Sequence, residues 1–305
     1  MAADATYRWD AGRIVPLVGG PMELVAVPNV SEGRDAAILD AVGAAFAGRA
    51  RVLDRHVDQD HHRAVFTLAG TPGRLAEAVL DGAREVVARI DLGSERGVHP
   101  HVGALDVAPI VFFDPLLRGA ACAEALVTAE LLASELALPV FLYGALAGGR
   151  TRAWLRRGGR RALAERIAAG ELKPDFGPRT LHPSAGATLV AARPPLVAFN
   201  VELAPPADLA LAKEIAAALR EPGRLAAIGV SLASRGDVAQ VSMNVEDPFA
   251  RPLAAIVEEI QTHARVGTAE IVGLVPRASL EGWPESLELR GFDPARQLAE
   301  NALTF

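Results

Sequence analysis

The sequence predicts an α+β protein made of two tandem split βαβ units, with mixed and antiparallel sheets. The order strand, helix, strand, strand, helix, strand can be followed over residues 22–113 and again over residues 195–275. The first strands of the two copies are similar, since residues 24–30 read LVAVPNV and residues 196–201 read LVAFNV. The 305 residues are enough to bury two cores, and half of them are hydrophobic. Together these observations indicate an internal duplication.

The elements of the first copy follow from the spacing of their apolar residues. Ile38, Leu39, Val42 and Phe46, for example, recur at the interval that places them on one face of a helix. The predicted elements are strand 22–27, polar turn 28–33, helix 35–46, strand 51–53, strand 64–68, helix 74–90 and strand 107–113, followed by helix 120–137 and strand 140–143.

The second copy repeats this order after a long connector. Its predicted elements are strand 196–201, helix 207–219, strands 226–232 and 238–245, helix 251–264 and strand 269–275. The connector, residues 144–194, is rich in Gly, Pro and Arg and is longer than connections within compact domains usually are. The predicted domain organisation is an extension over 1–21, an N-terminal subdomain with its connector over 22–194, a C-terminal subdomain over 195–277 and a tail over 278–305.

Composition narrows the setting in which the protein works. A net charge of -6 and a pI near 5.7 argue against nucleic acid as the main partner. The single cysteine, Cys122, cannot form an intrachain disulfide and is predicted to be a core residue of a helix. No apolar run reaches the roughly 20 residues of a membrane span. Acidic Asp4 precedes any apolar stretch, unlike a secretory signal. We therefore expect a cytoplasmic protein with no membrane partner.

The sharpest local motif is RGVHPHVGALD over residues 96–106, between a predicted helix and a predicted strand. Pro100 stiffens the backbone beside His99, and the flanking glycines allow tight turns. A histidine on such a loop can act as a general acid or base near neutral pH. The alternative is a surface loop in which His99 and His101 have no chemical role.

A second motif, DRHVDQDHHR over residues 54–63, holds three histidines and three aspartates within ten residues. These are metal-ligand types, so a metal-dependent hydrolase built on residues 54–62 is one hypothesis. Sequence density does not make ligands converge in space, however, and the chain contains no HExxH or CxxC pattern. The other interpretation is a hydrated loop between two strands, with no metal bound.

Two further stretches carry side chains or backbone suited to binding. Residues 174–188 contain three prolines and two glycines, and form either a rigid wall for a flat polar ligand or a structural crossover between the halves. The other stretch is a basic cluster in an acidic chain, made of Arg150, Arg152, Arg156, Arg157, Arg160 and Arg161. Guanidinium groups pair with carboxylates in a bidentate manner, so this cluster either attracts an anionic substrate or is a solvated surface.

Several ordered motifs match one known family. They are VPNVSEG at 27–33, the His-Pro-x-x-Gly-Ala-Leu-Asp-Val stretch at 99–107, PVFLYG at 139–144, PDFGP at 174–178, GAT at 186–188, AFN at 198–200, QVSMN at 240–244 and GLVP at 273–276. On these motifs the chain resembles the glutamate formimidoyltransferases, which also form the N-terminal domain of formimidoyltransferase-cyclodeaminase. The matching motifs are spread over residues 22 to about 277.

The resemblance implies transfer of a formimidoyl group from N-formimidoyl-L-glutamate to N5 of tetrahydrofolate, the co-substrate, in histidine degradation. It also implies two ferredoxin-like subdomains with a ligand groove between them, and a homodimer. The family's catalytic histidine, a general acid/base, maps to His99. The folate-binding segment maps to Gly177, Pro178, Arg179, Thr180, Leu181, His182, Pro183, Ser184, Ala185 and Gly186. The candidates for substrate binding are Asn29, Asp58, His101 and Arg156.

The chain differs from the family pattern at three positions. His101 stands where the family commonly has Arg, Ala185 where it often has Trp, and Ala145 where Glu usually follows Leu-Tyr-Gly. The acidic residue on the folate side has as candidates Asp54 and Asp58, with His56 as a further possibility. The differences leave two other hypotheses open: formyl transfer at the same folate site, or a non-catalytic folate-binding or regulatory protein on the same scaffold.

Overall fold

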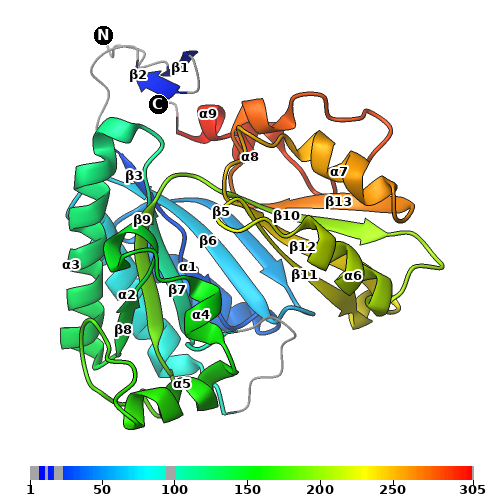
Figure 1. Ribbon diagram of the computed structural model, residues 1–305. Helices are drawn as coiled ribbons and strands as arrows, with labels where there is room; N and C mark the ends of the chain where they lie inside the picture. The colour runs from blue at the N-terminus through cyan, green and yellow to red at the C-terminus, as the bar shows by residue number, and fades with distance from the viewer. Residues whose placement is uncertain (1–6, 11–12, 17–22, 94–100, 304–305) are drawn as a thin grey trace. The chain divides into compact units, whose positions relative to one another are not determined.

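The computed structural model describes residues 7–10, 13–16, 23–93 and 101–303 (Figure 1). The chain forms two units, of which unit 1 consists mainly of Arg13–Pro194 and unit 2 mainly of Pro195–Phe305. Unit 1 contains a mixed sheet and unit 2 an antiparallel sheet, so the predicted α+β class is confirmed. Two short strands, β1 (Tyr7–Asp10) and β2 (Arg13–Pro16), lie near the N-terminus in sequence.

Seven strands form the sheet of unit 1. They are β3 (Leu24–Ala26), β4 (Asn29–Val30), β5 (Arg51–Asp58), β6 (Arg63–Gly70), β7 (Leu105–Val111), β8 (Val140–Leu142) and β9 (Thr188–Arg193). Because β3 and β4 both pair with β6 and β7, they act as one interrupted strand, and the order across the sheet is β5, β6, β3 with β4, β7, β9, β8. The pairs from β5 to β7 are antiparallel, whereas β9 is parallel to β7 and β8.

Two cores lie on opposite faces of this sheet. The helices and 3₁₀ turns are α1 (Ala36–Ala47), α2 (Arg74–Arg89), η1 (Pro115–Leu117), α3 (Arg118–Leu136), η2 (Gly144–Ala147), α4 (Arg152–Arg156) and α5 (Gly159–Ala168). α1 to α3 bury one core, where the rings of Phe46 and Phe66 meet edge to face at 5.1 Å. α4 and α5 lie over the other face of the sheet (Figure 1), and their residues Leu155 and Leu163 are buried in the second core. Strands between two cores are apolar on both faces, which explains the continuous apolar run of β9.

Two sequence predictions for unit 1 are wrong in extent. Residues 54–58 continue β5, whereas the sequence suggested a strand that ended at residue 53 and a loop after it. Pairing with β6 accounts for the difference, because His56 lies opposite Val65 and Asp58 opposite Arg63. The connector of residues 144–194 also supplies β9, an interior strand, together with α4 and α5. Its length therefore reflects a structured crossover.

Glu124 of α3 caps a neighbouring helix. α2 begins after Gly73, which offers no side-chain cap, and the buried Glu124 carboxylate accepts the backbone N–H groups of Gly73 at 2.5 Å and of Ala76 at 2.6 Å. We predict that Glu124→Gln lowers the free energy of unfolding by about 1–2 kcal/mol, since it removes the negative charge and one acceptor at a helix N-terminus. Urea denaturation with Glu130→Gln, an exposed control on the same helix, measures the effect. An equal loss in both variants would contradict the capping role.

Unit 2 is a four-stranded antiparallel sheet with helices on one face. Its elements are β10 (Val197–Leu203), α6 (Leu209–Leu219), β11 (Leu225–Leu232), η3 (Ala233–Arg235), β12 (Val238–Val245), α7 (Leu253–Gln261) and β13 (Val266–Val272). The strand order is β11, β12, β10, β13. Phe199 and Val201 of β10 pack with Ile215 of α6 and Val257 of α7 in the core. The alternating residues Asn200 and Glu202 therefore point to the other face of the sheet.

The segment after β13 packs into the core of unit 2. It contains η4 (Arg277–Leu280), α8 (Pro294–Gln297) and α9 (Ala299–Ala302). The Trp283 ring meets the Phe199 ring edge to face at 5.9 Å, and Leu287 and Leu298 are buried in the core. These contacts tie residues 278–303 to the sheet.

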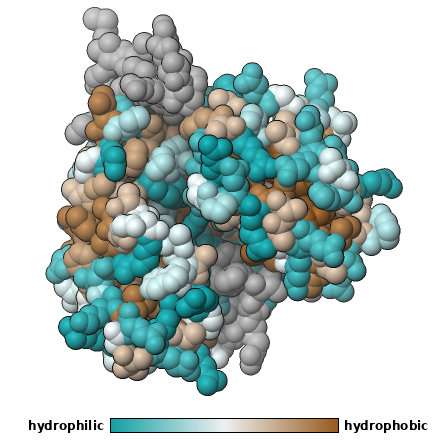
Figure 2. All heavy atoms as spheres, viewed as in Figure 1, coloured by the Kyte–Doolittle hydropathy of each residue, from teal (hydrophilic) through white to brown (hydrophobic). Residues whose placement is uncertain are grey.

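The surface of unit 1 includes an apolar area on α3. Leu116 just before the helix and Leu126 and Val127 on it are exposed large apolar side chains, and Figure 2 shows apolar residues gathered over this part of the molecule. Within the described ranges, none of the helices combines the length and the hydropathy that a membrane span requires.

The two units share one strand order. In unit 1, the first strand along the chain is β3 together with β4, and β5, β6 and β7 are the second, third and fourth. α1 follows the first strand and α2 follows the third. Across the sheet these strands lie in the order second, third, first, fourth. The four strands of unit 2 lie in the same order, with α6 and α7 between them. Asn29 of β4 and Asn200 of β10 occupy corresponding first strands, and in each case the asparagine points away from the helices.

Candidate functional site

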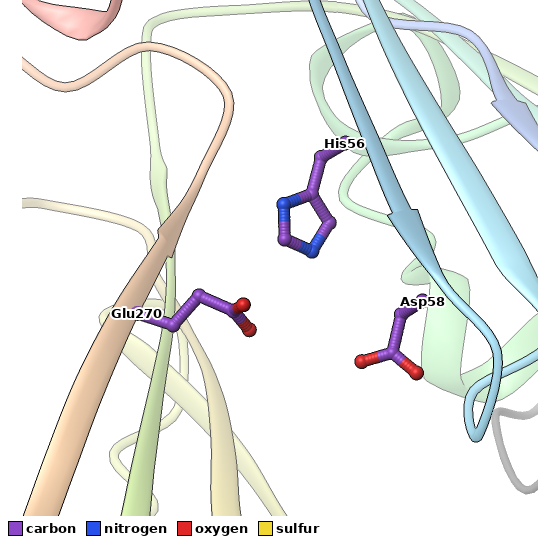
Figure 3. A group of neighbouring side chains, drawn as sticks. All are labelled: His56, Asp58 and Glu270. Atoms are coloured by element: carbon purple, nitrogen blue, oxygen red, sulfur yellow. The ribbon is translucent and has the colours of Figure 1, made fainter. Parts of the chain in front are cut away.

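Polar side chains gather on the face of the unit 1 sheet that is turned away from α1 and α2. Ala64, Phe66 and Leu68 of β6 are in the helix-covered core, so Arg63 points to the opposite face. The register places Asp58 of β5 opposite Arg63, and Figure 3 shows His56 and Asp58 projecting from the same side of β5. Val57 is the one apolar residue in the segment 54–58, so composition could not distinguish this segment from a polar loop.

Arg63 is the centre of a buried hydrogen-bonded group. Its guanidinium donates from Nε to Asn29 Oδ1 at 2.9 Å and also from Nη2 to the same oxygen. The Asn29 Nδ2 group donates to the Val27 carbonyl at 2.7 Å, which turns the amide oxygen toward Arg63. Arg63 Nη1 lies 3.4 Å from Asp106 Oδ2, and Arg156 pairs with the same carboxylate oxygen. Four elements, β4, β6, β7 and α4, thus contribute to one polar group.

Burial and neighbouring charges shift the pKa of Arg63. Burial lowers the pKa of Arg63 to about 9; Asp106 opposes the shift, and nearby Arg156 and Arg152 add to it. The Arg152 guanidinium lies over the ring of Tyr143, 5.7 Å from its centroid. We refer to Asn29, Arg63, Asp106, Tyr143, Arg152 and Arg156 as the Arg63 cluster. Asp106 pairs with both Arg63 and Arg156 in it, and guanidinium groups are suited to binding anions.

The stretch that contains the predicted catalytic histidine adjoins the Arg63 cluster. His99 itself lies outside the described residues, and His101 is partly exposed. The Val102 N–H donates to Asp106 Oδ1 at 2.8 Å. A Cβ on Gly103 would lie 1.9 Å from the Ala187 carbonyl oxygen, so this close backbone approach requires glycine. Asp106 therefore links the arginines directly to the backbone of residue 102.

The predicted folate segment divides into an exposed part and a buried part. Gly177, Pro178, Arg179 and Thr180 are exposed. Residues 182–186 form a turn in which His182 and Gly186 exchange two backbone hydrogen bonds of 2.9 and 3.0 Å, and His182 Nδ1 accepts the Ala185 N–H at 3.1 Å. The Ala185 carbonyl accepts the Ala104 N–H at 2.9 Å. The buried end of this segment is thus paired with the backbone of the histidine motif.

Gly186 permits this pairing. Its φ is +72°, and a Cβ there would lie 2.2 Å from the Val102 carbonyl oxygen. Gly170 has a similar φ of +74°, but no atom lies within 4 Å of the corresponding Cβ position. Gly170→Ala therefore introduces backbone strain without a steric clash. We predict that Gly186→Ala lowers the free energy of unfolding by about 1–2 kcal/mol more than Gly170→Ala does. Urea denaturation of both variants measures the difference, and equal losses would show that the close approach is unimportant.

Several predicted binding residues do not join the Arg63 cluster through any contact between described residues. The Asp58 carboxylate accepts the backbone N–H groups of Asp60 and His61, both at 2.8 Å, although Asp58 lies opposite Arg63 in the sheet. Of the predicted arginine cluster, only Arg152 and Arg156 are in the group. Arg150 pairs with Asp175 and Arg161 with Glu165, so the six arginines do not form one patch.

Three members of the Arg63 cluster were missed as functional candidates in the sequence. Arg63 ends the motif of residues 54–63, Asp106 ends that of residues 96–106, and Tyr143 lies in the PVFLYG motif. Each therefore lies inside a recognisable motif. The signal available in the sequence was an Asp or Arg next to the apolar residues of a predicted strand. Such a residue is seldom buried unless it is paired.

The motif of residues 54–63 does not form a metal site within unit 1. Figure 3 shows His56 and Asp58 on β5 and Glu270 on β13; Glu270 belongs to unit 2, where it accepts a hydrogen bond from Asn200 Nδ2 at 3.0 Å. Within either unit taken alone, the described residues bring no three Asp, Glu, His or Cys side chains to ligand distance. His62 Nδ1 accepts the Gly33 N–H at 2.9 Å, which occupies one ring nitrogen.

Comparison with known proteins gives consistent matches. Residues 23–193 match the family described as Formiminotransferase domain, N-terminal subdomain. The chain is 35% identical over 292 residues to a glutamate formimidoyltransferase of Streptococcus pyogenes, covering 91% of this chain and 97% of that protein. It is 32% identical over 289 residues to one of Thermoplasma acidophilum, covering 89% and 95%. A formimidoyltransferase-cyclodeaminase of Sus scrofa is 37% identical over 279 residues, and there the match covers 83% of this chain but 50% of the relative.

Proposed function

The chain belongs to the formiminotransferase family, and on that premise we propose that it transfers a formimidoyl group from N-formimidoyl-L-glutamate to N5 of tetrahydrofolate, a step of histidine degradation. The observation that carries this proposal is the match to glutamate formimidoyltransferases over nearly their whole length. Tetrahydrofolate is a co-substrate here, and the chemistry below requires no metal.

In the proposed reaction, N5 of the pterin attacks the amidine carbon of the donor and a new C–N bond forms. The tetrahedral adduct then loses the N5 proton, the bond from carbon to the glutamate nitrogen breaks, and glutamate leaves as an amine that gains a proton. One imidazole can accept the first proton and return the second, and such general acid/base catalysis contributes about 10²–10⁴-fold. We assign this role to His99, in the histidine motif that the chain shares with the family.

We assign folate binding to the segment from Gly177 to Gly186, and substrate binding to Asn29, Asp58, His101 and Arg156. Two contacts support this assignment. Ala185 pairs with Ala104 within the histidine motif, which joins the folate segment to the proposed catalytic stretch. Asn29 and Arg156 both belong to the Arg63 cluster, whose guanidinium groups suit a donor with two carboxylates.

The proposal extends to the organisation of the protein. We assign residues 22–194 and 195–277 to two ferredoxin-like subdomains, which the shared strand order supports. The ligand groove expected between the subdomains stays a prediction. We further propose a cytoplasmic homodimer, for which the exposed apolar residues Leu116, Leu126 and Val127 offer surface. Light scattering coupled to gel filtration gives the molar mass that tests the dimer.

Transfer assays with two donors test the function. N-formimidoyl-L-glutamate and N-formyl-L-glutamate are supplied side by side with tetrahydrofolate, and the folate product is followed by absorbance. We expect transfer from the formimidoyl donor. Transfer from the formyl donor alone would establish the alternative donor at the same folate site. Calorimetric binding of tetrahydrofolate without transfer from either donor would instead indicate a non-catalytic folate-binding or regulatory protein.

A further inference from the structure

We propose that Arg166 of α5 is a positioning residue for binding of N-formimidoyl-L-glutamate, because it fixes the end of α4 from which Arg156 reaches Asp106. The inference rests on the proposed function for the substrate-binding role of Arg156. Arg166 acts through the helix and not through its own contact with the substrate. All four elements involved, α4, α5, β7 and the loop before β7, belong to unit 1.

The helix α4 depends on contacts outside itself for its stability. It has five residues, and isolated helices shorter than about 12 residues are marginal in water. At its start, Thr151 Oγ1 accepts the Trp154 N–H at 3.1 Å, and in its interior Leu155 is fully buried in the second core. The carbonyl groups at the end of a helix have no partners within it and need donors from elsewhere.

Arg166 supplies donors for the end of α4. Its Nη1 donates to the Trp154 carbonyl at 3.2 Å, and its Nη2 donates to the Leu155 carbonyl at 2.6 Å. The same guanidinium lies over the Trp154 ring, 4.9 Å from the ring centroid. A planar guanidinium with several N–H groups is suited to holding two neighbouring acceptors, and a cation at the C-terminal end of a helix is favourable. Arg166 therefore ties α4 to α5.

Arg156 directly follows the carbonyl groups that Arg166 holds. It is the last residue of α4, and its guanidinium pairs with Asp106, which is 1% exposed. The Arg156 Nε–H is buried and has no acceptor among the described residues. Buried donors are usually paired with protein, water or ligand, so this group suits an oxygen of the substrate. The Leu155 carbonyl belongs to the peptide bond that joins Leu155 to Arg156, so Arg166 fixes the backbone next to that donor.

Calorimetric titration of the full chain with N-formimidoyl-L-glutamate tests this role without relying on turnover. Arg166→Gln should raise the Kd about 5- to 10-fold, because one neutral amide group cannot hold both carbonyls. Arg166→Lys keeps a positive charge at the end of α4 and should recover part of the loss. Arg161→Gln is the matched control on α5, since it removes a charge from a side chain that is 92% exposed, and it should leave the Kd unchanged.

Combination with Arg156→Gln separates positioning from a general loss of structure. Residues that act through one shared contact are not additive, so Arg166→Gln should cause no further rise in Kd once Arg156→Gln is present. A merely structural role would instead weaken binding by the same factor in both backgrounds. Thermal unfolding checks that each variant is folded, and Arg166→Lys takes the place of Arg166→Gln in the combination if the latter does not fold.

The outcomes distinguish this proposal from the proposed function. An unchanged Kd in Arg166→Gln or in Arg156→Gln, a further rise in the combined variant, or no binding of N-formimidoyl-L-glutamate by the wild type would overturn the positioning role. Binding with the expected variant effects but without transfer to tetrahydrofolate would refute the proposed function and keep the positioning role. Transfer by the wild type together with an unchanged Kd in Arg166→Gln would do the reverse.

Discussion

Replacement of His99 by alanine should lower the turnover of formimidoyl transfer at least about 10²-fold and leave the free energy of unfolding nearly unchanged. The proposed reaction needs one group that removes a proton from N5 and then gives a proton to the departing glutamate nitrogen. Imidazole does both near neutral pH, whereas alanine does neither. Steady-state kinetics with N-formimidoyl-L-glutamate and tetrahydrofolate, together with urea denaturation of the same samples, measure the two quantities.

The control for this variant is His263→Ala, which removes an exposed histidine of unit 2 outside the motifs considered for catalysis. It should keep normal turnover. Added imidazole should restore part of the activity of His99→Ala, because a free base can partly replace the missing side chain, while a purely structural loss would not respond. Near-normal turnover of His99→Ala would remove this residue from the mechanism, and equal loss in both variants would point to a general effect on folding.

Much of the fold could be predicted because apolar residues repeat at the period of the element they form. The helical interval of Leu39, Val42 and Phe46 gave α1, and these residues are buried in the core. β12 was predicted with the bounds that the structure has, Val238–Val245. β5 was predicted too short because its inward face is partly exposed and the outward face carries Asp54, His56 and Asp58, so it lacks a strong apolar alternation.

Pairing between distant segments could not be predicted from local pattern. β9 is an interior strand, but it lies after a long crossover, and nothing in the run of residues 188–193 identifies β7 and β8 as its neighbours. Strand register is a long-range property that depends on both partners. The sequence therefore predicts a connector here, whereas the structure shows that this segment supplies part of the second core of unit 1.

The candidate site was predictable to the extent that its residues lay in recognisable motifs. The sequence predicts binding roles for Asn29 and Arg156, and both belong to the Arg63 cluster. Arg63 and Asp106 do not stand out in the sequence, because each ends a motif whose histidines are more conspicuous. Their relationship depends on β6 and β7 both lying beside β4, which is a consequence of topology. Chemistry that arises from three strands and a crossover helix is not encoded by spacing along the chain.

Asp106→Asn should lower the free energy of unfolding by about 3–5 kcal/mol, the cost typical of breaking a buried ion pair. Asparagine preserves the size of the side chain and an oxygen that can accept the Val102 N–H. It removes the carboxylate that Arg63 and Arg156 share, so both guanidinium groups lose that partner. Guanidinium chloride denaturation of the full chain, monitored by circular dichroism, measures the loss.

A double-mutant cycle distinguishes lost charge pairing from general disruption of the core. Arg156→Gln alone removes one cation of the pair, and Asp106→Asn combined with Arg156→Gln removes both charges. Because residues in one ion-pair network are coupled, the double variant should be less destabilised than the sum of the single variants by about 1–3 kcal/mol. Additive losses would show that Asp106 acts through packing, and a loss below about 1 kcal/mol in Asp106→Asn would show that the cations are compensated by other means. A double variant that is less destabilised than this sum would instead establish that Asp106 and Arg156 stabilise the fold through their charges.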